Sequence, residues 1–419
     1  MHPALAELTW GGGEFLVTAG GAPAAAGPTV AIHREASGTT ITFMGLLQAG
    51  ISAAGPWADV VGADTPFLET SDAPQRFYRS RDMGGVFEEE GVVRLVLQGP
   101  LQRHFELAFA GLPDGIFPPV REKPWFPGSV RVAGEEIRAT LRVRGNSSLQ
   151  ECPFPKLKFK VAREDREGTP FAGAREVKVG SHCAEGGRGS IGRLREEAAV
   201  YREAMAYEVM HLLGFLSPRV ERARVTYRDT SPPREGSETG WTLTRNAMLL
   251  DDAEVVAERL GGRALDDDEI TALTDADFDA QTITDLRCFH VLLGNWDFAL
   301  SVDGRNLWNT EVIERADGRL IPVAGDFDLA SWVTEEVQDT VPHDYLPELP
   351  LLDRRARYEL EVLGKSVTPA QFAAAKERFA SKRSELESLV QGALVDEVGR
   401  TNALRHLTVF QNALAATQR

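Results

Sequence analysis

Four polar residues that could bind a divalent cation lie in one short window of the sequence, residues 294–331. They are Asp297, Asn306, Asp326 and Asp328, and the apolar runs VLLGNW and LIPVAGDF lie around them. Carboxylates placed among core-forming residues cost free energy unless they are paired or bind a cation. Carboxylate and amide oxygens are the ligands that Mg²⁺ and Mn²⁺ prefer. The window therefore predicts a divalent-cation site.

The order of these residues also fits phosphoryl transfer. Asp297 comes first, Asn306 follows it, and the stretch ADGRLIPVAGDFD predicts a turn and a strand that end at Asp326. Kinase active sites use a catalytic Asp, then a metal-binding Asn, then a metal-binding Asp after a strand. The alternative is structural: the Asp-Gly pairs make turns, and Asp326 and Asp328 cap a helix.

A row of lysines could supply the cation that such a reaction needs. Lys156, Lys158 and Lys160 alternate along FPKLKFKVA, so they share one face of a predicted strand. Such a row can be a solvated strand edge, or one lysine can point inward to nucleotide phosphates. The preceding RGNSS, residues 144–148, could form the turn over those phosphates.

The elements that must position these residues predict an α+β protein. Residues 1–82 are rich in Gly, Pro and short strand patterns, which indicates a small β-sandwich-like module. Residues 83–252 predict a β-rich lobe with one long helix, expected from Ser190 to Gly214. Residues 253–419 predict a helical lobe, so the expected plan is two-lobed and kinase-like.

Composition excludes some classes of function. The net charge of −16 disfavours a nucleic-acid-binding face. No apolar run is long enough to span a bilayer, and no signal peptide is visible, so the compartment stays open. Cys152, Cys183 and Cys288 are odd in number and widely spread, which predicts packed thiols and no disulfide framework. A metal site at Cys152, His182 and Cys183 lacks paired spacing.

Several motifs together resemble the spore-coat CotH kinase-like family, and more narrowly its uncharacterised bacterial branch. They are LRVRGNSS…FPKLKFKV, YREAMAYEVMHLLGF, ARVTY and GNWDF…RN…IPVAGDFDLAS, and they cover roughly residues 100–331. Upstream, residues 55–81 (GPWADVVGADTPFLETSDAPQRFYRSR) resemble a bacterial β-sandwich-like module. The resemblance implies an atypical kinase that uses ATP with Mg²⁺ or Mn²⁺ on Ser or Thr of an unidentified acceptor protein. It also favours an extracytoplasmic or cell-surface location.

The resemblance assigns a role to individual residues. Lys158 matches the cation on the nucleotide phosphates, Glu203 its partner on the helix, and Asp297 the catalytic-loop Asp. The implied metal ligands are Asn306 and Asp326, with Asp328 as a further ligand or a cap. The implied nucleotide contacts are Arg144, Asn146, Ser147, Lys158, Met248 and Leu250. The loop from Asp297 to Asn306 is longer than the family's Asp-x₄-Asn, which puts the role of Asp297 in doubt.

Two other functions are compatible with these features. A kinase-like fold can support a different ATP-dependent transfer, such as AMP transfer or glutamylation, because a fold does not fix a reaction. A pseudokinase or surface-binding protein without turnover would keep the fold and lose the chemistry. The group that becomes covalently attached to the acceptor discriminates among them.

Overall fold

The structure is a computed structural model that describes most of the chain. It covers residues 29–417 except 36–37, 45, 53, 61–66, 70–75, 82–84, 88–90, 111–122, 146–147, 184, 190–191, 234–239 and 303–304. The secondary structure is mixed α and β, as the sequence predicted. No helix within these ranges is long and apolar enough to cross a membrane.

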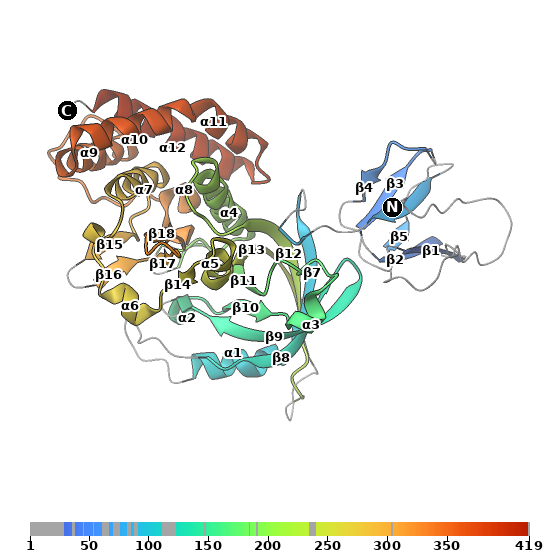
Figure 1. Ribbon diagram of the computed structural model, residues 1–419. Coiled ribbons are helices and arrows are strands. Elements are labelled where there is room, and N and C mark those ends of the chain that lie inside the picture. Colours follow the sequence, from blue (N-terminus) through green and yellow to red (C-terminus); the bar gives the residue numbers. More distant parts are fainter. Residues whose placement is uncertain are drawn as a thin grey trace.

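The N-terminal strands form two small sheets around a shared core. Their bounds are β1 Thr29–Glu35, β2 Gly38–Met44, β3 Leu46–Gly50, β4 Ala58–Asp59, β5 Phe67–Glu69 and β6 Phe77–Arg81. The sheet orders are β1-β2-β5 and β4-β3-β6. Ile41, Phe43, Leu47 and Tyr78 pack together between the strands. In Figure 1 these strands lie apart from the rest of the chain. The predicted boundary at residue 82 falls outside the described residues.

A closed barrel of seven strands follows, in the region where the sequence predicted a β-rich lobe. Its order is β10-β11-β13-β12-β7-β8-β9, and only the β7–β12 pair is parallel. The bounds are β7 Val93–Gly99, β8 Phe126–Val132, β9 Glu135–Arg144, β10 Lys156–Lys160, β11 Glu176–Ser181, β12 Val220–Asp229 and β13 Thr242–Asp251. Short helices α1 Leu101–Phe109, α2 Ser148–Glu151 and α3 Arg163–Arg166 connect some of them.

Alternation along the strands explains the barrel. In β7 and β9 every second residue is buried and apolar, which is the period of a strand with one face in a core. Leu97, Val130, Phe159 and Val177 are fully buried inside the barrel. The opposite face of β9, β10 and β11 carries charged residues and looks toward the C-terminal half of the chain.

Helix α4 packs against β12 and β13 on the outside of the barrel (Figure 1). It spans Glu197–Leu212, so it starts later than the predicted Ser190. A glycine-rich loop precedes it, and Gly192 has a φ of +91°, which is unfavourable for other residues. The glycines therefore keep this segment out of the helix.

The C-terminal half is largely helical. Its helices are α5 Ala253–Arg259, α6 Asp267–Thr271, α7 Ala280–Leu293, α8 Ser331–Thr334, α9 Leu351–Ser366, α10 Pro369–Ser381, α11 Arg383–Gly392 and α12 Glu397–Ala416, with 3₁₀ turns η1 Asp275–Asp277 and η2 Phe327–Leu329. Its strands are β14 Arg263–Ala264, β15 Ala299–Val302, β16 Arg305–Trp308, β17 Thr310–Glu314 and β18 Leu320–Ala324. Helix α10 begins with a capping box at Thr368, and Pro369 takes its first position.

Candidate functional site

Lys156 begins strand β10 and points away from the barrel interior. Leu157 and Phe159 fill the interior, so the lysines at 156, 158 and 160 share the opposite face, as the alternation predicted. The Lys156 side chain is only 8% exposed, and its Nζ lies 3.0 Å from Asp326 Oδ1 and 3.0 Å from Asp328 Oδ2. Burial acts to lower the pKa of Lys156, but the two carboxylates outweigh it and raise the pKa. Lys156 is therefore a buried, charged cation.

Lys158, the lysine that the sequence analysis selected, lies elsewhere. Its Nζ lies 2.5 Å from Glu176 Oε1 on β11 and 3.3 Å from Asp252 Oδ2, directly after β13. Lys160 also pairs with Glu176, at 2.7 Å. The cation beside the acids is thus Lys156, because the segment after β18 docks at the start of β10 and not at its middle.

Asp326 occupies a constrained backbone position directly after β18. Its φ of +54° is left-handed, which is uncommon for a residue other than glycine and is often found at functional sites. The backbone N–H of Asp326 donates to the Tyr207 hydroxyl at 3.0 Å. Asp326 stands at the N-cap position of η2, but its side chain makes no capping bond. The carboxylate of Asp326 therefore does not cap η2. The Asp326 side chain is 40% exposed.

Asp328 is held more tightly than Asp326. Its Oδ2 accepts from Lys156 and also from Nη1 of Arg193, a residue that is 4% exposed. Arg193 Nε lies 3.4 Å from Glu151 Oε2. Of the two acids, Asp326 is the more exposed and therefore the more open to a ligand. Asp328 contacts both Lys156 and Arg193.

Helix α4 supplies two side chains to the same place. Glu203 and Tyr207 are four residues apart and therefore share one helix face. Burial raises the pKa of Glu203 to about 8, and the positive charge of Lys156 acts in the opposite direction. The sequence analysis paired Glu203 with Lys158, whereas its electrostatic partner is Lys156.

Asp297 lies in the loop after α7 and is fixed by several hydrogen bonds. Trp308 Nε1 donates to its Oδ1 at 2.9 Å, and Asn309 Nδ2 donates to its Oδ2 at 2.9 Å and to its carbonyl at 2.7 Å. Burial raises the pKa of Asp297 to about 6, and the nearby negative charge of Asp326 adds to the rise. A carboxyl with a pKa near neutrality is suited to accept a proton.

Asn309, which the sequence analysis did not select, contacts Asp297. Asn306 lies in β16 one strand earlier, and its side chain lies outside the described part of the structure. Asn309 immediately precedes β17, has a φ of +55°, and its carbonyl accepts from Gly325 N at 2.9 Å. It therefore links Asp297 to the residue before Asp326. The sequence signal for Asn309 is its position directly before β17, because β17 pairs with β18 and Asp326 follows β18.

The predicted nucleotide contacts are only partly described. Asn146 and Ser147 lie outside the described residues. Arg144 ends β9 directly opposite Lys156. Met248 and Leu250 are buried on β13, and Leu250 lies opposite Lys178 on β11.

Gly180 on β11 lies directly opposite Met248 on β13. A Cβ at Gly180 would lie 2.8 Å from Met248 Cε, so the glycine leaves room for that side chain. Met248 and Leu250 pack in the core shared with α4.

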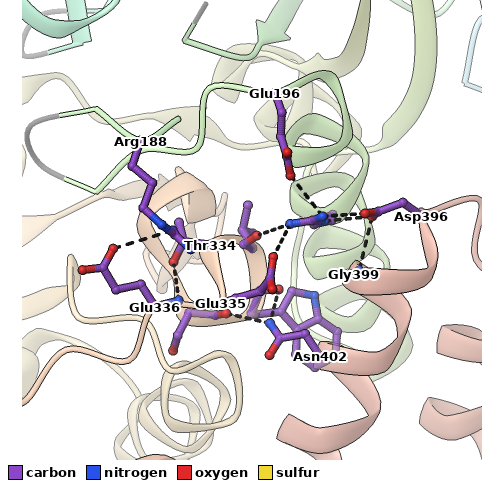
Figure 2. A network of polar contacts seen from close by, with 12 residues as sticks. Arg188, Glu196, Thr334, Glu335, Glu336, Asp396, Gly399 and Asn402 are labelled. Carbon is purple, nitrogen blue, oxygen red and sulfur yellow. Dashed lines mark hydrogen bonds and ion pairs between the residues drawn. The ribbon is translucent and has the colours of Figure 1, made fainter. Parts of the chain in front are cut away.

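A network around the buried side chain of Arg202 joins α4 to the segment after η2 and to the C-terminal helix (Figure 2). Arg202 Nε donates to Asp396 at 2.8 Å, and its Nη1 donates to Glu335 at 2.9 Å. Nearby, Arg188 lies 3.6 Å from Glu336. These bonds hold α4, and with it Glu203 and Tyr207, against the segment that carries Asp326.

The prediction of packed, unpaired cysteines is wrong for two of the three. Cys152 and Cys183 form a disulfide that joins the segments before β10 and after β11. Both line a small cavity with Lys156, Arg193 and Glu203. Cys288 is a buried free thiol, as expected. The widely separated cysteines meet because β10 and β11 are antiparallel neighbours.

The loop before α4 contains a glycine motif that the sequence analysis did not select. Gly187, Gly189 and Gly192 have the spacing G-x-G-x-x-G, and Arg193 follows them directly. The loop precedes α4 and does not connect two strands, so it differs from a protein-kinase glycine loop. Within the described residues, no group of three or more His, Cys, Asp or Glu side chains is placed to hold a metal. An Asp326 site would therefore need an amide such as Asn309 and ligand oxygens.

Comparisons with known proteins give little support. No family model matches the chain, and no curated protein matches it. Among solved structures, the chain is similar to the Helicobacter pylori proinflammatory kinase CtkA, with 10% sequence identity and a TM-score of 0.32. The match covers 62% of this chain and 92% of that chain. The CotH resemblance therefore stays a prediction from the sequence motifs.

Proposed function

We propose that this chain is an atypical, two-lobed kinase that transfers a phosphoryl group from ATP to a Ser or Thr hydroxyl of a protein. The observation that supports it most is the contact of buried Lys156 with Asp326, beside Glu203 of α4. A lysine from the sheet, a glutamate from the adjacent helix and an aspartate after a strand are the set that phosphoryl transfer uses to bind and orient phosphates.

The residues present fit a bound Mg²⁺ or Mn²⁺. Asp326 offers a partly exposed carboxylate, and Asn309 lies next to it through Gly325. Hard cations of this kind bind few protein oxygens and keep others from water or phosphate. The cation would offset negative charge on the phosphates, while Lys156 and Arg144 would contact phosphate oxygens directly.

Asp297 is the proposed proton acceptor. Its carboxylate is oriented by Trp308 and Asn309, and its pKa is raised to about 6. It would take the proton of the acceptor hydroxyl as the oxygen–phosphorus bond forms. Asp297→Asn keeps the shape and removes this base, so we expect the transfer rate to fall by about 100-fold or more while nucleotide binding persists.

Intact-mass measurement tests the transferred group. The purified protein is incubated with ATP and Mn²⁺, with and without a generic Ser/Thr-containing acceptor protein. A gain of about 80 Da per site on either protein means phosphate, and about 329 Da means AMP. Asp297→Asn serves as the inactive control. A chain that binds ATP with Mn²⁺ but modifies nothing would support the pseudokinase alternative and contradict the proposal.

A further inference from the structure

The charged face of β9, β10 and β11 carries more cations than a single lysine–phosphate contact needs. We name this set the cation face; it consists of Arg142, Arg144, Lys156, Lys158, Lys160 and Lys178. Arg144 lies directly opposite Lys156, and Lys158 lies between Arg142 and Lys178 on its two neighbouring strands. Six positive charges thus occupy adjacent positions on three strands, and the four lysines among them pair with carboxylates.

Like charges directly opposite one another destabilise a sheet. The arrangement is notable in a chain with a net charge of −16. Among the described residues, Arg142 and Arg144 have no carboxylate partner. Arg142 lies 5.5 Å from the ring of Trp125, and Arg144 Nε is buried without a hydrogen bond. These two arginines are available to an anion.

The position of Arg144 connects the cation face to the acids. Arg144 lies directly opposite Lys156, whose Nζ contacts Asp326 and Asp328. An anion bound at Arg144 would therefore also lie near Lys156. A chain of phosphates has the charge density and the length to satisfy several of these cations at once.

Ion pairs join the cation face to β17 and to the β13–α5 connection, and we call them the ionic closure. Lys178 Nζ on β11 lies 2.5 Å from Glu311 Oε1 on β17, and 3.8 Å from Asp252 Oδ2. Lys158 also contacts Asp252. Pockets for a planar aromatic ligand are mostly apolar with a few placed polar groups. The surroundings of Lys178 are charged and not apolar, so they do not offer a pocket of that kind.

We propose that the cation face recognises its phosphoryl donor by the polyphosphate chain and does not enclose a nucleobase. The ligand class is a divalent-cation polyphosphate, either free or carried by any nucleoside. This inference rests on the proposed function. In the transfer, the terminal P–O anhydride bond breaks, a P–O bond to the acceptor oxygen forms, and the acceptor proton passes to Asp297. The leaving group is the polyphosphate chain, or nucleotide, shortened by one phosphate.

Calorimetry on the full chain with Mg²⁺ separates the two sources of the phosphate chain. The ligands are ATP, GTP, CTP and inorganic tripolyphosphate. We expect their dissociation constants to agree within about threefold, because the base adds no contact. In Glu311→Ala the ionic closure is gone, so ATP should bind more tightly relative to tripolyphosphate by about threefold or more.

Glu314→Ala is the matched control, since Glu314 lies on the same strand and pairs with Arg263 at 2.7 Å. Its affinity ratio should equal that of the parent. ATP binding more than about tenfold tighter than tripolyphosphate in the parent would overturn this inference while leaving the proposed kinase intact. An unchanged ratio in Glu311→Ala would overturn the role of the Lys178–Glu311 pair. No binding of any of the four ligands would refute the proposed function itself.

Discussion

Lys156 and Lys158 stand two residues apart on one strand and on one face, yet their surroundings differ. Lys156 is 8% exposed and bonds to acids from the C-terminal half, whereas Lys158 is 18% exposed and bonds to acids at the barrel and its exit. One lysine therefore joins two parts of the molecule, and the other neutralises its own neighbourhood. Alternation along a strand determines which residues share a face, but docking of a distant segment decides which of them meets the acids.

The largest difference should appear on substitution of the two lysines. Lys156→Met removes the cation between Asp326 and Asp328, so we expect the transfer rate to fall by about 100-fold or more. Lys158→Met keeps that contact and should change the rate by less than about tenfold. Steady-state assays with ATP and Mg²⁺ measure both. Equal losses in the two variants would mean that neither position is distinguished by its contacts.

The Arg202 network should stabilise the packing of α4, the helix that carries Glu203. Arg202→Met leaves Asp396 and Glu335 without their buried cation, and we expect the free energy of unfolding to fall by about 3 kcal/mol. Arg188→Met is the control, because its side chain is 37% exposed and should cost under about 1 kcal/mol. Denaturant unfolding measures both; similar losses would place the network outside the forces that hold α4.

A pH-dependent effect should arise at Glu203. Its pKa is raised to about 8 in the folded protein from an ordinary 4.5, so the folded state holds a proton that the unfolded chain has lost. Stability from this group is therefore fully present below pH 4.5 and is lost as pH rises toward 8.

Glu203→Gln should flatten this part of the stability profile. Glu197→Gln, on α4 and paired with Arg224, should leave the slope unchanged. Unfolding by denaturant at several pH values between 5 and 8 compares the two variants with the parent. A parent slope that persists in Glu203→Gln would assign the titration to another group.

The sequence predicted those elements whose signal is local. The strands over 135–160, the helix α4 and the capping box at Thr368 follow from alternation, periodicity and turn residues. Barrel closure depends on the parallel pairing of β7 with β12, which joins residues far apart in the chain and leaves no local pattern.

The site was predicted in part for the same reason. Glu203, Asp297 and Asp326 lie close enough for their charges to act on one another, and each is near a motif with recognisable spacing. Lys156 and Asn309 contact these acids, whereas the sequence analysis selected Lys158 and Asn306, which lie two or three residues away. Local sequence cannot separate such neighbours, because the choice depends on three-dimensional docking. Arg193 was missed for the same reason, since its partner Asp328 is distant in sequence.

Asp326→Asn is the substitution that examines the centre of the proposed site. Asp326→Asn should lower the stability of the ligand-free fold. Burial acts to raise the pKa of Asp326, but Lys156 and Arg193 outweigh it and hold that pKa below the usual range. We therefore expect a lower melting temperature for the ligand-free variant than for the parent.

The most direct measurement compares the melting temperatures of the parent and Asp326→Asn with ATP, in Mg²⁺ and in EDTA. A ligand that binds only the folded state raises the melting temperature in proportion to its affinity. We expect the parent to be stabilised by ATP with Mg²⁺ and not in EDTA, and the variant to be stabilised in neither. Equal stabilisation of parent and variant by ATP with Mg²⁺, or equal stabilisation of the parent in EDTA, would contradict a metal–phosphate site at Asp326.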